Sequence, residues 1–297
     1  MPARPDTHTG VIHDIGYRHY DGPRLGRGYA ARSLFLQSLR GAYGLGRSGK
    51  SKVLPMILYA VMSLPALIIV AVAVATDADE LPLEYTRYAI YLQAVITLFV
   101  AAQAPQAVSR DLRFKMIPLY FSRPIERIDY VVAKFLALTG ALLVLLVTPL
   151  LVLYVGALLA KLPFAEQTEG FAQGLVAALL LSLLYAGLSL VVAALTPRRG
   201  FGVAAIIALF TISYGAVSSL QEVADNEGNH DVAGWLGLFS PVTILDGVQS
   251  WALGATPAGP QGPPGNGAGF VFLLVLLGLV AASFGLLMRR YRKVGLS

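Results

Sequence analysis

The sequence of 297 residues contains no cysteine, and only 13% of its residues are charged. Without cysteine, neither a disulfide framework nor a thiolate metal site can form. A soluble domain usually carries about 25% charged residues. Here 56% of the residues are hydrophobic, so the composition is typical of a membrane protein. The first 50 residues also lack the apolar core of a signal peptide, and we expect no cleavage there.

Charge is absent from six long apolar stretches: residues 56–76, 88–107, 135–160, 171–195, 201–220 and 269–288. The shortest contain 20 residues, enough for a helix to cross the hydrocarbon core of about 30 Å. We therefore predict an all-α integral membrane protein with six transmembrane helices. A large soluble helical protein is the alternative, and six uncharged stretches of this length disfavour it.

Basic residues flank these stretches on alternate sides. The segment before the first stretch, the second and fourth connections and the carboxyl-terminal tail hold 21 of the 23 Lys and Arg residues. The other connections hold 11 of the 17 acids. The positive-inside rule then places both termini in the cytoplasm. The net charge of +6 suits anionic lipid head groups and requires no nucleic acid partner.

The chain divides into residues 1–52, a cytoplasmic tail with an amphipathic helix, and residues 53–297, the transmembrane domain. Leu34, Phe35 and Leu39 recur near helical spacing in the first part. This pattern predicts a basic amphipathic helix lying in the membrane interface. An ordinary helix packed on a partner is the alternative.

The long connection at residues 221–268 contains five acids and neither Lys nor Arg. Trp235 and Trp251 lie in its moderately apolar middle, which predicts an extracytoplasmic helical segment that lies at the outer interface or re-enters the membrane. Ten of the sixteen residues at 254–269 are Gly or Pro, so this end should be an irregular strap.

Residues 44–51, Gly-Leu-Gly-Arg-Ser-Gly-Lys-Ser, match the phosphate-binding P-loop pattern. A P-loop requires a buried strand before it and a helix after it. This segment instead follows an amphipathic helical pattern and leads into the first apolar stretch. We interpret it as a basic link, and we expect the chain to bind no nucleotide, metal ion or other cofactor. A nucleophile–base cluster is also lacking, so we expect no catalytic residue.

The second connection, residues 109–130, mixes charges with large apolar side chains and contains Pro118 and Pro124. A simple linker would be polar, so this segment should fold as short helices against its own spans and a cytoplasmic partner.

Together, these parts resemble the permease subunit of type-2 ABC exporters over nearly the whole chain. The most specific piece is the second connection, which resembles the coupling helix of that family. There Arg110-Asp111 leads through Phe121-Ser122-Arg123-Pro124-Ile125 to Tyr130 and Lys134. The family often has glutamate where Asp111 stands. The tail at residues 14–22 and the ratio of 17 Arg to 6 Lys resemble proteins of GC-rich, actinobacterial genomes.

The resemblance implies that a separate ATPase subunit, in two copies or two kinds, binds ATP and Mg²⁺ and docks on the second connection. It also implies a second permease, either a copy of this chain or a sister, in a bacterial plasma membrane. The predicted ATPase interface comprises Arg110, Asp111, Arg113, Phe114, Phe121, Arg123, Pro124 and Ile125.

Two further interpretations concern transport. Gln93 and Gln103 lie within a predicted span and are candidates for a substrate path, although helix–helix hydrogen bonding also explains such residues. An ion-coupled carrier is a competing function, but it usually needs charged groups inside the membrane, and the spans have none. A membrane anchor or assembly subunit without transport is the other alternative.

Overall fold

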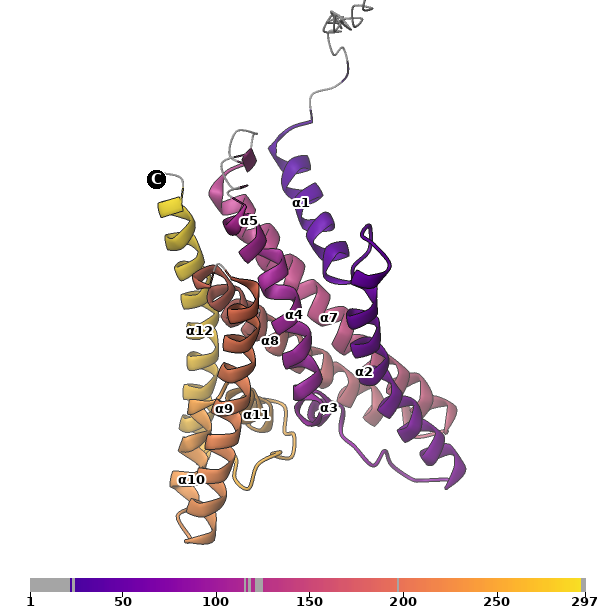
Figure 1. Ribbon diagram of the computed structural model, residues 1–297. Helices are drawn as coiled ribbons and strands as arrows, with labels where there is room; N and C mark the ends of the chain where they lie inside the picture. Colours follow the sequence, from indigo (N-terminus) through magenta and orange to yellow (C-terminus); the bar gives the residue numbers. More distant parts are fainter. Residues whose placement is uncertain are drawn as a thin grey trace, which may run out of the picture.

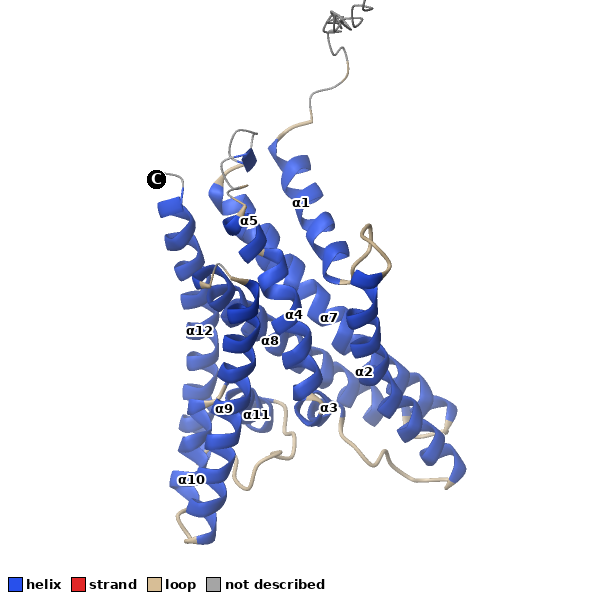
Figure 2. Ribbon diagram, viewed as in Figure 1, coloured by secondary structure: helices blue, strands red, loops and turns tan. Residues whose placement is uncertain are grey.

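The computed structural model describes residues 22, 25–114, 116, 119–120, 125–196 and 198–294. Figure 2 shows helices joined by loops, and this described part of the chain contains no strand. Five helices are long and apolar enough to cross a membrane. They are α2 (Lys50–Ala75), α7 (Arg127–Leu159), α8 (Phe164–Leu195), α9 (Arg199–Asn226) and α12 (Gly265–Val294). The predicted all-helical membrane architecture is confirmed.

The second predicted span is broken. It consists of α3 (Tyr85–Tyr91) and α4 (Gln93–Ala107), which meet at Leu92. The helical segments Tyr85–Tyr91 and Gln93–Arg113 are bent there by 62°, and together they could form the sixth span. The span predicted at residues 88–107 thus corresponds to the end of α3 and the whole of α4, and the break at Leu92 was not predicted. Tertiary contacts hold α3 in this orientation, because Arg87 donates to the Pro257 carbonyl at 2.9 Å and the Tyr85 hydroxyl donates to Gln167 at 2.8 Å.

Helix α1 (Arg27–Ala42) runs beside the first turns of α7 (Figure 1). At one end Arg27 reaches the start of α7, and just beyond the other end the Tyr43 hydroxyl donates to the Ala141 carbonyl at 2.7 Å. The predicted amphipathic helix is thus present and packs on α7. Its position in a membrane interface stays a prediction.

The loop between α1 and α2 contains the P-loop-like residues. Gly44 has a φ of 69°, in the left-handed region, and a Cβ there would lie 2.5 Å from the Ser51 carbonyl oxygen. A tight turn between two helices therefore explains this glycine. Because α1 and not a strand precedes the loop, the architecture that a P-loop needs is not formed.

Helices α7 and α8 lie at the centre of the bundle, and α7 packs against α1, α2, α8 and α12. Outer faces of the long helices expose large apolar side chains, including Ile57, Leu67, Phe201, Ile212 and Leu274. A lipid-facing surface has this character, since lipid tails favour apolar contact. Helix α7 has 33 residues and is about 50 Å long, longer than a bilayer core is thick.

The segment after α9 forms α10 (His230–Leu236), the 3₁₀ helix η1 (Gly237–Phe239) and α11 (Pro241–Ala252). A strap without helix leads from there to α12. Asp246 of α11 holds the strap, because its carboxylate accepts hydrogen bonds from the amides of Ala258 and Gly259. Burial raises the pKa of Asp246, and these amide hydrogen bonds oppose that rise.

Figure 1 places the start of α1, helix α5 (Ser109–Arg113), the start of α7 and the end of α12 at one end of the molecule. Helices α3, α10 and α11 lie toward the opposite end. The segments rich in Arg and Lys are thus gathered at one end, which we call the basic end.

Candidate coupling site

Helix α5 begins the second connection at the basic end. The Ser109 hydroxyl donates to the Ala193 carbonyl of α8 at 2.9 Å, which fixes the start of α5 against the bundle. Of the predicted interface residues, Phe121, Arg123 and Pro124 lie outside the described residues, as does the side chain of Arg110. The described part of the connection still contains a polar cluster and an exposed surface.

Asp111 of α5 is the centre of the polar cluster. Its Oδ2 accepts a hydrogen bond from the Tyr130 hydroxyl at 2.8 Å and lies 3.0 Å from Nζ of Lys134. The side chains of Asp111 and Lys134 are only 12% and 10% exposed, so water contributes little to their solvation. A buried ion pair that is also hydrogen bonded resists the loss of either partner. The pair therefore joins α5 firmly to α7.

Tyr130 extends this cluster through aromatic contacts. Its ring centroid lies 5.6 Å from that of Tyr120 in the second connection and 5.0 Å from that of Tyr291 in α12. Nζ of Lys134 lies 5.4 Å from the Tyr130 centroid, within the range of a cation–π contact. Tyr130 and Tyr291 are almost fully buried. One side chain thus connects the second connection, α7 and α12.

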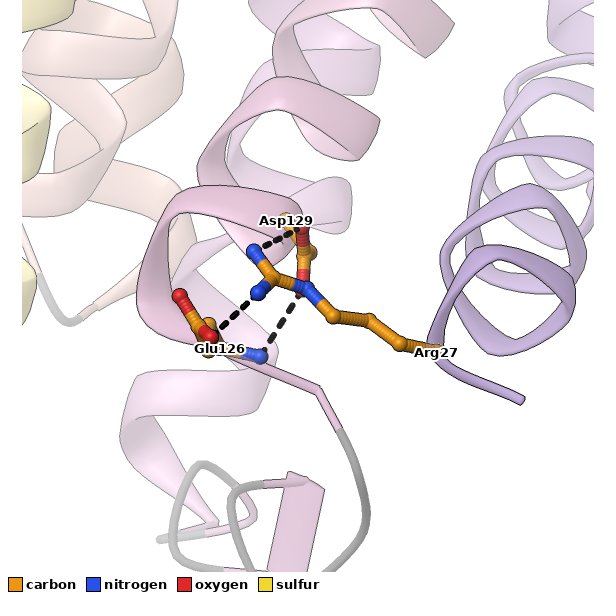
Figure 3. A network of polar contacts seen from close by, with 3 residues as sticks. All are labelled: Arg27, Glu126 and Asp129. Atoms are coloured by element: carbon orange, nitrogen blue, oxygen red, sulfur yellow. Dashed lines mark hydrogen bonds and ion pairs between the residues drawn. The ribbon is translucent and has the colours of Figure 1, made fainter.

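A second polar cluster joins α1 to the start of α7 (Figure 3). The Arg27 guanidinium donates to both carboxylate oxygens of Asp129, at 2.7 and 3.0 Å, and forms an ion pair with Glu126. Hydrogen bonding to Asp129 raises the pKa of Arg27. Asp129 also accepts from the Glu126 amide and so caps α7. The same carboxylate therefore begins α7 and holds α1.

The surface of the second connection combines a cation with apolar side chains. Arg113 is exposed and its guanidinium lies 5.8 Å from the ring centroid of Phe114. Phe114 and Leu119 are 62% and 66% exposed, and Met116 is exposed as well. Ile125, by contrast, is buried, as is Asp111. Of the predicted interface residues whose side chains the structure describes, Arg113 and Phe114 are therefore exposed, and Asp111 and Ile125 pack inside the chain.

Comparison with known proteins identifies the family of this chain. The model for the ABC-2 family transporter proteins matches residues 35–296. The chain belongs to the ABC-2 transporter family. No curated protein matches it. It is a multi-pass membrane protein and a membrane component of this transporter family, and the resemblance of the sequence to ABC-2 type permeases is confirmed.

In this ABC-2 transporter protein, the two predicted path residues lie apart. Gln103 is buried and lines a cavity of about 220 Å³ at the basic end, next to Gln106, Asp111 and Lys134. Gln93 begins α4 just after the bend, about 15 Å away along the helix axis. A polar path through both residues is not formed by α4 alone.

The sequence did not predict a site role for Arg27, Glu126 or Tyr291. The Glu126-x-x-Asp129 spacing is a recognisable capping pattern and could have marked the start of α7. The partners of this cap and of Tyr130 come from α1 and α12, at large distances in sequence. No local signal indicates them.

Proposed function

We propose that this chain is the permease subunit of an ATP-driven exporter in a bacterial plasma membrane. A separate ATPase subunit binds ATP and Mg²⁺, docks on the second connection and drives two permeases, which are copies or sisters. The observation that carries the proposal is the buried Asp111–Lys134 pair, because it ties the predicted docking segment to a membrane-spanning helix.

The gathering of basic segments at one end supports a cytoplasmic position for that end. Both termini are then cytoplasmic, and α3, α10 and α11 face outward. With α3 and α4 counted as one crossing, the chain crosses six times, which is consistent with α1 and the end of α12 lying at the same end.

The exposed group of Arg113, Phe114, Met116 and Leu119 is the docking surface that we propose for the ATPase. Exposed aromatic and apolar side chains beside a cation are typical of protein interfaces. Movement of this surface passes to α7 through Asp111 and to α12 through the Tyr130–Tyr291 contact. Packed elements shift as units, so ATP-driven closure of the ATPases would reorient these helices together.

The test is copurification of the ATPase with the full-length permease from native membranes. The Arg113→Glu variant combined with Phe114→Ala should recover less than about one fifth of the ATPase, because both the cation and the apolar contact are lost. Arg198→Glu with Arg199→Glu is the control, since these exposed cations lie at the junction of α8 and α9. Full recovery with the first variant would contradict docking at this surface.

ATP hydrolysis by the purified complex separates a transporter from a membrane anchor. A transporter should hydrolyse ATP at a rate that depends on cargo, and inside-out vesicles should then accumulate that cargo when given ATP. An anchor or assembly subunit predicts neither result. Uptake by right-side-out vesicles with internal ATP would instead indicate import.

A further inference from the structure

A second cavity lies at the elbow where α1 leads into α2. It has a volume of about 520 Å³ and opens between α1 and the loop after it. The polar clusters of the coupling site do not line it. Its lining includes Gly46 and Arg47 of the P-loop-like segment. We call it the elbow cavity.

The lining of the elbow cavity is strongly cationic. Arg32, Arg40 and Arg47 contribute to it, and no acidic residue among those that the structure describes does. Arg32 and Arg40 are exposed, and neither forms an ion pair with a residue that the structure describes. The carboxylates of Glu126 and Asp129 at the start of α7 bind Arg27 and do not line this cavity. An anion is the complementary ligand, because guanidinium groups bind phosphate oxygens with several hydrogen bonds.

The same cavity also offers apolar contact. Tyr29, Leu36 and Leu45 line it, with 58%, 37% and 47% of their surface exposed. The first two turns of α2 then expose Val53 and Leu54, followed by Ile57. A purely ionic ligand such as inorganic phosphate would leave these side chains in water. The combination fits an amphiphile that carries both a negative charge and an alkyl chain.

We propose that the elbow cavity binds the head group of an anionic phospholipid. The phosphate lies between Arg32 and Arg40, and the acyl chains run along the exposed apolar start of α2. The position favours this ligand, because α2 is a candidate membrane span and its first residues lie where head groups meet the hydrocarbon core. The proposal concerns lipid alone and holds whether or not an ATPase docks on the second connection.

A nucleotide would be a different occupant of these cations. The loop follows a helix instead of a strand. The close approach of the Ser51 carbonyl explains why a glycine stands at position 44. The structural context of a phosphate-binding loop is therefore missing, and lipid is the occupant to which we commit.

The experiment is native mass spectrometry of the delipidated full-length protein in detergent. Phosphatidylglycerol, phosphatidylcholine, glycerol 3-phosphate and ATP are each added at the same concentrations. We expect phosphatidylglycerol to bind at least tenfold more tightly than phosphatidylcholine. Glycerol 3-phosphate and ATP should give no comparable bound species, since neither has acyl chains. This comparison uses the unmodified chain and needs no variant to fold.

Two variants then locate the site. Arg32→Gln with Arg40→Gln should weaken phosphatidylglycerol binding about tenfold or more, because two surface cations are removed. Leu36→Asn with Leu45→Asn should weaken it severalfold by removing apolar contact. Arg198→Gln with Arg199→Gln, two exposed cations at the α8–α9 junction, should leave it unchanged.

Three results would overturn the proposal. Equal binding of phosphatidylcholine would remove the role of charge, and equal binding of glycerol 3-phosphate or ATP would indicate a phosphate or nucleotide site. An equal loss in the Arg198 and Arg199 control would indicate that cations at the basic end attract lipid without a specific site.

Discussion

At the scale of single residues, the buried ion pair of Asp111 and Lys134 links the second connection to the membrane-spanning helix α7. Asp111→Asn or Lys134→Met alone leaves one buried charge without its partner and should destabilise the protein by about 3–5 kcal/mol. The double variant should be more stable than the sum of the two losses implies, because no charge remains unpaired. Thermal unfolding in detergent measures all three, and strictly additive losses would contradict the pairing.

Gly44 provides a residue-scale test of the loop between α1 and α2. Gly44→Ala combines a φ of 69° with a Cβ placed 2.5 Å from the Ser51 carbonyl oxygen, so the loop must shift. We expect the free energy of unfolding to fall by about 2–3 kcal/mol, measured by thermal unfolding in detergent. Gly46→Ala is the matched control, because Gly46 has a φ of 80° but no atom of a described residue lies within 4 Å of its Cβ position. Only the backbone strain of about 1 kcal/mol should remain there.

At the scale of elements, the strap that follows α11 is tied to the start of α3, which leads to the bend at Leu92. Thr256 donates to the Glu84 carboxylate through its amide and its hydroxyl, and Arg87 donates to the Pro257 carbonyl. Glu84→Ala with Arg87→Met should release the strap and speed amide hydrogen exchange there by about tenfold or more. Glu80→Ala, an exposed acid in the preceding loop, is the control. Unchanged exchange in the double variant would mean that other contacts hold the strap.

The sequence indicated the helices well and their ends less well. Uncharged runs of 20 residues must form helices in a membrane, because every backbone group there needs an internal partner. Yet α7 starts at Arg127, eight residues before the predicted span, because Glu126 and Asp129 cap it. Hydrophobicity carries no information on such a cap.

For the candidate site, the sequence predicted the exposed surface but not the long-range contacts. Arg113, Phe114 and Met116 are exposed, as a docking segment rich in apolar and charged residues requires. The contacts of Asp111 with Lys134 and of Arg27 with Asp129 join residues far apart in the chain. Those pairings follow from the packing of α1, α5 and α7, and no local pattern specifies them.

At the scale of the whole molecule, the sidedness of the chain is the property on which the proposed docking depends. The absence of cysteine makes it measurable, since an introduced cysteine has no competing thiol. Ser48→Cys and Phe114→Cys should resist a membrane-impermeant maleimide in spheroplasts and react after permeabilisation. Asp79→Cys and Asn229→Cys should react from outside, because they lie in exposed loops toward the other end. Labelling is read from the mass of the purified chain.

The same four positions also test whether α3 and α4 cross the membrane as one bent span. If they cross, Asp79 and Phe114 lie on opposite sides, and the second connection faces the compartment that contains ATP. If α3 and α4 only dip into the membrane and return, Phe114→Cys reacts from outside together with Asp79→Cys. Five crossings would then remain, the ends of the chain would lie on opposite sides, and an ATPase could not reach the second connection. If ATP hydrolysis acts through the Asp111–Lys134 pair, the second connection must face the cytoplasm. Phe114→Cys should then be protected from the reagent while Asp79→Cys reacts.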